Sequence, residues 1–594
     1  MNGRERGWVA LFSFAVGFVL VLPFLLMPLQ RGFYKTRFPV EAAAWPLNGS
    51  FSALESFHMD VDVYPYAARM RQAGEHLLAG DPHIKENRSR RLIVREFLSF
   101  EVLGLFYRLA GSPSRAWVLA QFVLSALWVP VLFWLFLEAG CERGPALAAS
   151  VALTLFNDLT RLPMTTDLRV LLGSAAQYSL WPLGSYNYWF GPTRMTRPLL
   201  TYPLLFIAAV LGARLGVARG RKEVVAAGLV GGALAYVHPD VWAVYVAATA
   251  LFAAWLSWKR RAPAFGVLAS LALTLALSIP WLWLSFAGGE DSPLTGGLWA
   301  RGPDLKGLLY AAAAILAFRD RRSSPLMLWM GCLLLGVALL LNAHLIIGVQ
   351  GANTSLWWYL GNTSAAIVVG KRVVDALRLS PSSWRWLAAC IVLAALPRAF
   401  GYSSQHYRLY ALPAEEEQAL RWLETNARPE SVVAALSPMT VFRVPIYTRC
   451  KTLTSMIFPL TSDISFRENA RRIHEALGLF GVSPQAFVAQ AFDASSRWDR
   501  RLWSGEVDVQ GHDRSGQAAR YFLDAFDPGR FSRLLEEAAH DERGDFTDYL
   551  WVGPFERALM PGGKPPRLSG AAEVFSNGTV TIYALGPSAS IRRP

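Results

Sequence analysis

The sequence predicts a polytopic α-helical membrane protein that carries a water-soluble domain after its last membrane span. Long apolar segments alternate with short basic connections over the first 400 residues, and the composition becomes polar after Phe400. Only 17% of the 594 residues are charged and 53% are hydrophobic. Soluble domains carry about 25% charged residues, and about 20 apolar residues are enough to cross a bilayer.

The first apolar segment, Trp8–Met27, contains no charged residue and follows two arginines, Arg4 and Arg6. No small-residue cleavage site follows it, so we expect a retained anchor and not a secretory signal. Hydropathy indicates roughly eleven spans in total. The further apolar stretches lie at about 115–138, 145–160, 199–213, 223–237, 240–258, 263–286, 306–318, 325–347, 355–370 and 384–400.

The basic connections predict the orientation of the chain. With the N-terminus in the cytoplasm, every connection on the cytoplasmic side is basic, as the positive-inside rule requires. The odd number of spans then places the loop at about 30–114 and everything after Phe400 on the extracytoplasmic side. The basic residues are Arg143; Arg214, Arg219, Arg221 and Lys222; Lys259, Arg260 and Arg261; Arg319, Arg321 and Arg322; and Lys371, Arg372 and Arg378.

We therefore divide the chain into a transmembrane domain at 1–400 and a soluble extracytoplasmic domain at 401–594. The second part reads as mixed α/β. Glu415–Asn426 predicts an amphipathic helix, Ser431–Leu436 and Tyr549–Val552 predict strands, and Glu573–Leu585 predicts a hairpin. The Asn577-Gly578 pair at the hairpin turn is a strong short-range signal, because both residues tolerate the positive φ of a tight turn.

Two extracytoplasmic loops are too long to be simple connections. The loop at 30–114 contains Tyr64–Ala79 and Leu92–Leu109, whose apolar residues recur at helical spacing with charges between them. We expect both stretches to be amphipathic helices at the membrane surface. The loop at 161–198 is rich in Gly, Pro and aromatic residues, which predicts a compact segment at the interface.

Composition and missing motifs exclude several classes of function. The formal charge of +14 comes largely from basic residues beside the spans, so topology and anionic lipid headgroups explain it and we expect no nucleic-acid partner. The four cysteines are scattered and imply no disulfide framework. The sequence contains no phosphate-binding glycine loop, H-E-x-x-H, paired C-x-x-C or G-x-S-x-G, which removes support for nucleotide-driven transport and zinc hydrolysis.

The acidic run His58–Tyr64 contains the first candidate site. Asp60 and Asp62 stand two residues apart just ahead of the first amphipathic stretch. On an extended backbone they would converge on a divalent cation such as Mg²⁺ or Mn²⁺, or one would act as a general base. The alternative is an acidic pair that stabilises a helix N-terminus.

Two further groups are candidates for binding a phosphate. Arg194 and Arg197, in GPTRMTRP, offer guanidinium groups that match phosphate oxygens in pairs, whereas the alternative is that they anchor the end of a span. His238, in His-Pro-Asp between two spans, is the third candidate. The alternative for His238 is a turn residue, because a turn between helices tolerates polar side chains.

The chain resembles the GT-C superfamily of integral membrane glycosyltransferases, most closely uncharacterised bacterial members. The resemblance lies in the single span followed by a long loop that opens with an acidic motif, then Tyr64, an amphipathic helix and Gly80-Asp81. It also lies in the C-terminal domain, entered through ALRWLETNARPESVVAAL. The resemblance covers the architecture of most of the chain, whereas sequence motifs carry little of it.

The resemblance implies a polyprenyl-phosphate-linked sugar as donor, membrane lipid as surroundings, and an aspartate of the first loop as base or metal ligand. That role falls on Asp60 or Asp62, although the Asp-Glu pair of several GT-C families is absent. It implies transfer of the sugar to an extracytoplasmic lipid, glycan or protein at a bacterial inner membrane. The alternative is a non-catalytic protein, such as a lipid-linked saccharide flippase or an assembly partner for envelope polymers.

Overall fold

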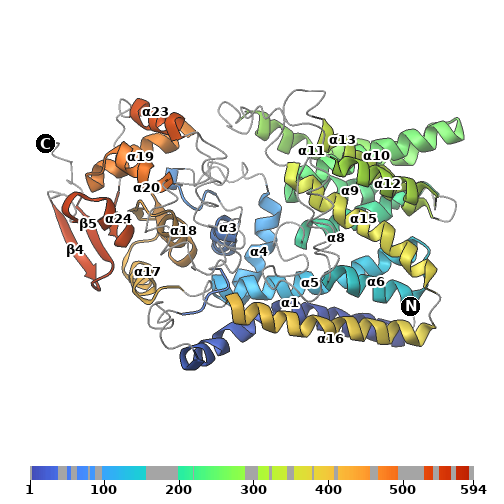
Figure 1. The fold of residues 1–594 in the computed structure, drawn as a ribbon. Coiled ribbons are helices and arrows are strands. Elements are labelled where there is room, and N and C mark those ends of the chain that lie inside the picture. Colours follow the sequence, from blue (N-terminus) through green and yellow to red (C-terminus); the bar gives the residue numbers. More distant parts are fainter. Residues whose placement is uncertain are drawn as a thin grey trace.

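The computed structural model describes a bundle of long helices and a smaller part built on a five-stranded sheet (Figure 1). The residues that it describes are 3–37, 50–54, 63–77, 80–86, 96–155, 199–217, 220–287, 305–319, 324–343, 354–377, 380–406, 412–454, 466–492, 528–538, 547–563 and 570–586.

Each apolar segment predicted from the sequence overlaps one helix of the bundle. Apolar side chains that repeat at helical spacing favour this structure because a helix satisfies its own backbone hydrogen bonds within lipid. The helices are α1 (Gly3–Arg37), α5 (Pro113–Glu138), α6 (Arg143–Leu155), α8 (Thr201–Leu215), α9 (Arg221–Val237), α10 (Pro239–Arg260), α11 (Phe265–Ala287), α12 (Lys306–Arg319), α13 (Pro325–Asn342), α15 (Thr354–Ala376) and α16 (Pro381–His406).

Five helices of the described residues are long and apolar enough to cross a membrane: those in α1, α5, α10, α11 and α13. Two shorter apolar helices, Thr201–Leu215 and Ser382–Pro397, accompany them. Large apolar side chains point outward from the bundle, among them Phe14, which is 61% exposed, and Trp283, which is 74% exposed. Such a surface suits lipid. The protein is therefore an integral membrane protein, while the number of eleven spans stays a prediction.

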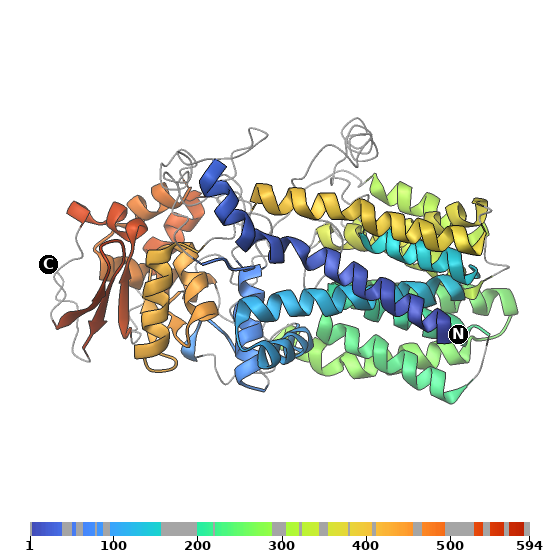
Figure 2. The same ribbon diagram turned by 90° about the horizontal axis from the view of Figure 1, so that it is seen from below.

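Polar contacts join helix ends at the end of the bundle where α1 begins, which is marked N in Figure 2. Arg143 at the start of α6 pairs with Glu5 near the start of α1 at 2.5 Å. Arg214 at the end of α8 pairs with Glu138 at the end of α5, and the Glu138 carbonyl accepts a hydrogen bond of 2.8 Å from Ser324, just before α13. Described residues of three predicted basic connections, Arg143, Arg214 and Arg260, thus make contacts of this kind. Which side of the membrane this end faces stays a prediction.

The opposite end of the bundle carries α3 (Val63–Glu75) and α4 (Phe97–Ala110). Figure 1 shows α4 running across the direction of the bundle helices, with α3 between α4 and the smaller part. The two helices approach closely at Gly74 and Gly104: a side chain added at either glycine would meet atoms of the other helix within 3 Å. The expected helices at 64–79 and 92–109 are thus present with shifted bounds.

The position of α3 differs from the expected one. We expected its charged residues to face water at the membrane surface, yet Arg69 and Arg71 are buried. The reason is that α3 also contacts α18 (Pro438–Tyr447) of the smaller part, so its polar face is covered by protein.

The smaller part has its own hydrophobic cluster, which includes Val433, Leu550 and Ile582. Its sheet has the order β2-β1-β3-β5-β4, with β1 parallel to β2 and β3, and β5 antiparallel to β3 and β4. The strands are β1 (Val432–Ala434), β2 (Lys451–Thr452), β3 (Tyr549–Val552), β4 (Ala571–Ser576) and β5 (Thr581–Leu585), and the helices besides α18 are α17 (Ala414–Asn426), α19 (Phe466–Phe480), α20 (Pro484–Phe492), α23 (Pro528–Ala538) and α24 (Pro554–Leu559).

Sequence signals within this part match the observed elements. The predicted strand Tyr549–Val552 is β3, and the predicted hairpin is β4 and β5 with Gly578 at a φ of 85° in the turn. The domain boundary at 400 and 401 stays a prediction, since α16 continues through it to His406.

The basic residues at the end of the bundle where α1 begins predict opposite exposure of its two ends. A reporter fused after residue 410 should report extracytoplasmic exposure, and one fused at Arg260 should report the cytoplasm, because the positive-inside rule orients the basic end. Exposure at the two positions is measured with alkaline phosphatase and fluorescent-protein fusions. Equal signals from both positions would contradict the topology.

Candidate functional site

Four of the five candidate residues lie outside the described residues: Asp60, Asp62, Arg194 and Arg197. The structure therefore neither brings these four together nor separates them. It does fix the chain next to them. Asp62 directly precedes Val63, the first residue of α3, and Arg197 stands two residues before Leu199.

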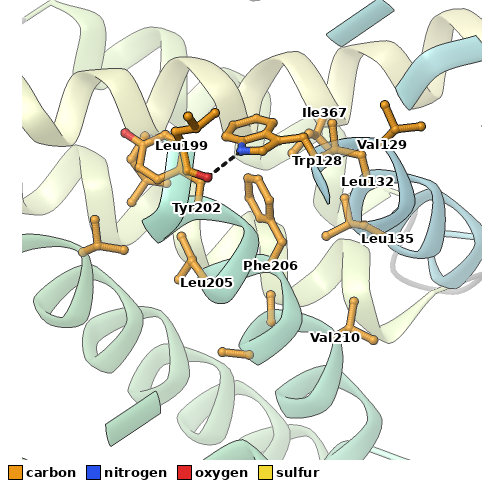
Figure 3. Close-up of a cluster of buried hydrophobic side chains, with 14 of the residues drawn as sticks. Trp128, Val129, Leu132, Leu135, Leu199, Tyr202, Leu205, Phe206, Val210 and Ile367 are labelled. Atoms are coloured by element: carbon orange, nitrogen blue, oxygen red, sulfur yellow. Dashed lines mark hydrogen bonds between the residues drawn. The ribbon is translucent and has the colours of Figure 1, made fainter. Parts of the chain in front are cut away.

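The chain after Arg197 is anchored in the core of the bundle. The indole Nε1 of Trp128 on α5 donates a hydrogen bond of 2.9 Å to the carbonyl of Leu199 (Figure 3). The Trp128 ring also contacts Tyr202 and Phe206 of α8, with ring centroids 6.2 and 6.3 Å away. A buried indole that bonds one backbone carbonyl fixes where the preceding loop enters the bundle.

His238 is the one candidate that the structure describes, and it forms the junction between α9 and α10. Its side chain is 1% exposed, with Nε2 3.0 Å from a carboxylate oxygen of Glu96 and Nδ1 3.7 Å from one of Asp240. Ser99 on α4 donates a hydrogen bond of 2.8 Å to the carbonyl of Val237 in the same junction. The junction thus joins the ends of three helices: α4, α9 and α10.

Two carboxylates beside the His238 ring change what this residue can do. A phosphate at the same place would be repelled by both Glu96 and Asp240. The geometry therefore favours a role for His238 in joining helices. The phosphate-binding role of His238 stays an untested prediction that these distances do not support.

The first loop is held by the C-terminal part before the acidic run begins. The backbone N–H of Ser50 donates to a carboxylate oxygen of Glu417 at 2.9 Å, and the carbonyl of Ser50 accepts from the N–H of Leu412 at 3.0 Å. The hydroxyl groups of Ser52 and Tyr447 lie 2.7 Å apart. These bonds link residues that are more than 300 positions apart in the chain.

The loop is held again directly after the acidic run, through Arg71 of α3. Its guanidinium, 5% exposed, donates to Glu424 at 2.8 Å, to Glu75 at 3.1 Å and to the carbonyl of Ile446 at 3.2 Å. A guanidinium suits this position because its planar donors reach several acceptors at once. The contact joins α3 to both α17 and α18.

A third contact is made by residues 80–86, which cover the edge strand β2. Asp81 accepts the N–H groups of His83 at 2.8 Å and Ile84 at 3.2 Å, which closes a tight turn. The Lys451 ammonium donates to the Asp81 carbonyl at 2.7 Å, and the N–H of Thr452 donates to the His83 carbonyl at 2.9 Å. The turn thereby pairs with a strand edge that would otherwise be open.

His83 is fully buried in this turn. The pKa of its imidazole is lowered to about 4, mainly by burial; the nearby Asp81 carboxylate raises this pKa, and the charges of Arg69 and Lys451 lower it. His83 is therefore neutral at pH 7. Its role is to pack the turn against Phe442, whose ring centroid is 6.2 Å away.

Among the described residues, no three His, Cys, Asp or Glu side chains are grouped so as to hold a metal ion. The predicted Mg²⁺ or Mn²⁺ ligands, Asp60 and Asp62, lie beyond those residues, so a cation there stays a prediction.

Sequence reasoning did not find the residues that hold the first loop. Glu417 and Glu424 stand seven positions apart in EEEQALRWLETN, which puts them on one face of α17. The pattern is also that of an ordinary solvated helix face. The sequence therefore shows that the two glutamates share a face, but not that they contact Ser50 and Arg71.

Comparison with known proteins finds similarity in structure and none in sequence. No protein-family model and no curated protein matches the sequence. The structure is similar to the crystal structure of ArnT from Cupriavidus metallidurans bound to undecaprenyl phosphate, with 12% sequence identity, 99% of each chain covered and a TM-score of 0.43.

The lowered pKa of His83 predicts a pH dependence of stability. The unfolded chain takes up a proton below a pKa of about 6.5 while the folded chain resists it down to about 4, so stability is lost as the pH falls through that window, by about 3 kcal/mol at most. His83→Phe should reduce the loss. The loss is measured as the difference in unfolding free energy of the detergent-solubilised protein between pH 7.5 and pH 5.0, with His76→Phe as control. An equal loss in the wild-type protein and both variants would contradict a lowered pKa of His83.

Proposed function

We propose that this protein is a membrane glycosyltransferase that moves a sugar from a polyprenyl-phosphate carrier to an extracytoplasmic acceptor. The observation that supports it most is the burial of α3 between the end of the bundle and the C-terminal part. The Asp60–Asp62 motif directly precedes this helix in the chain. A carboxylate in that neighbourhood would meet a sugar whose lipid tail remains in the bilayer.

The distribution of charge within the described spans supports a reaction at the membrane surface. In the five candidate spans, charged residues occur within three residues of a helix end, and those of α11 and α13 carry none. A transporter is expected to place ionisable groups at mid-span. A saccharide flippase, the alternative from a different class, is therefore less well supported.

In the proposed reaction, Asp60 or Asp62 takes the proton of an acceptor hydroxyl group. The hydroxyl oxygen attacks the anomeric carbon, the bond from that carbon to the phosphate oxygen breaks, and the prenyl phosphate leaves with the electron pair. Arg194 or Arg197 stabilises the charge on the leaving phosphate. A divalent cation held by Asp60 and Asp62 would supply additional charge neutralisation.

The aspartate role predicts a large loss of transfer in one of two variants. Removing a positioned general base costs about 10²–10⁴ in rate, so Asp60→Asn or Asp62→Asn should abolish detectable transfer at normal protein level. Transfer is measured in proteoliposomes with a panel of polyprenyl-phosphate-linked radiolabelled sugars and envelope lipids as acceptors. If both variants transfer sugar at the wild-type rate, the assignment is wrong.

The arginine role predicts that lysine will not replace arginine at the phosphate site. Lysine keeps the charge but loses the paired donors, so Arg194→Lys or Arg197→Lys should weaken donor affinity nearly as much as the alanine variant. An arginine that only anchors a span tolerates lysine, because both side chains reach the interface. Donor affinity and protein level are measured separately; full tolerance of lysine at both positions would show that the arginines are structural.

A further inference from the structure

The acidic run lies between two segments that are both held by one helix. Residues 50–54 precede it and α3 follows it, so eight residues of chain, 55–62, join the two held segments. On the near side, Glu417 accepts the Ser50 N–H at 2.9 Å. On the far side, Glu424 accepts from Arg71 at 2.8 Å. Both glutamates belong to α17.

The spacing of the two glutamates fits this arrangement. Seven residues are two helical turns, so Glu417 and Glu424 lie on the same face of α17 about 10 Å apart along its axis. Their neighbour Glu416 points elsewhere: it pairs with Arg443 of α18, inside the C-terminal part. Of these adjacent residues, Glu416 therefore attaches α17 to α18 within the C-terminal part, and Glu417 contacts the first loop.

The attachment is rigid because several bonds meet at each end. Glu424 also accepts the Arg449 N–H at 2.8 Å, which fixes the carboxylate that holds Arg71. Hydrogen bonds to a charged group are roughly twice as strong as neutral ones. At the other end, the carbonyl of Ser50 bonds the N–H of Leu412, two residues before α17.

We propose that Glu417 and Glu424 are positioning residues, through which α17 sets the separation of the two ends of the acidic run and so places its aspartates. This inference rests on the proposed function, because the aspartates act there as base or metal ligand. Neither glutamate is a catalytic residue. Their effect is transmitted through Ser50 on one side and Arg71 on the other.

The test compares Glu417→Ala and Glu424→Ala with the matched control Glu475→Ala. Glu475 on α19 is also a carboxylate partner of a buried arginine, Arg471. Arg471 keeps Glu468 when Glu475 is removed, just as Arg71 keeps Glu75. The control therefore removes a carboxylate from a buried arginine within one helix of the C-terminal part. All three proteins are full-length chains in proteoliposomes.

Two readouts are expected to separate Glu417→Ala and Glu424→Ala, here called the bracket variants, from the control. Displacement of a catalytic group by about 1 Å costs up to about 100-fold, so kcat should fall 10- to 100-fold in Glu417→Ala and Glu424→Ala with an unchanged KM for the donor. Amide hydrogen exchange should accelerate in residues 50–54 and α3. Glu475→Ala should change neither readout.

The outcomes distinguish the two proposals. If the wild-type protein transfers no sugar, the proposed function fails, and hydrogen exchange alone still decides whether α17 holds both segments. If the bracket variants match Glu475→Ala in exchange and in kcat, the positioning role is overturned. If exchange accelerates but kcat stays at the wild-type value, α17 holds the loop without placing the reactive group, and the inference also fails.

Discussion

The burial of a polar helix between two apolar cores is the contact on which the arrangement of this molecule depends. Helix α3 carries Arg69 and Arg71, which are both shielded from water. A buried guanidinium is costly unless it is paired, so Arg71 requires Glu424 and the Ile446 carbonyl from the C-terminal part. The core of the bundle extends to Met439, Phe442 and Ile446 of α18. The two parts are joined through α3 together with residues 50–54 and 80–86.

The helices of the bundle were the most predictable feature because lipid removes the alternatives. A spanning segment must satisfy its backbone hydrogen bonds internally, so an apolar segment of sufficient length becomes a helix whatever its neighbours are. The strand at Tyr549–Val552 and the turn at Asn577-Gly578 were predictable for a related reason, since both depend on residues close in sequence. Local chemistry decides these elements without reference to the rest of the chain.

Contacts between distant residues could not be predicted in this way. Ser50 and Glu417 are 367 positions apart, and Ser52 and Tyr447 are 395 apart. A glutamate that holds another segment and one that faces solvent look the same within the sequence of α17. The candidate site shares this difficulty, because spacing alone did not choose between Asp60 and Asp62. His238 shows the converse: its sequence context allowed a phosphate ligand, and its carboxylate neighbours Glu96 and Asp240 argue for a helix junction.

The bundle and the C-terminal part both hold segments of the first loop. The bundle fixes depth in the membrane, because its apolar surface has no other favourable surroundings. Its helices α5 and α9 contact α4 of the first loop, and α4 packs on α3. Helices α17 and α18, which come more than 300 residues later, hold α3 as well, through the bonds of Arg71. We therefore expect a substitution at Glu424 in the C-terminal part to act on α3. Residues that control the site in such a molecule are found by following buried charges across the interface, and not by searching near the reactive group in sequence.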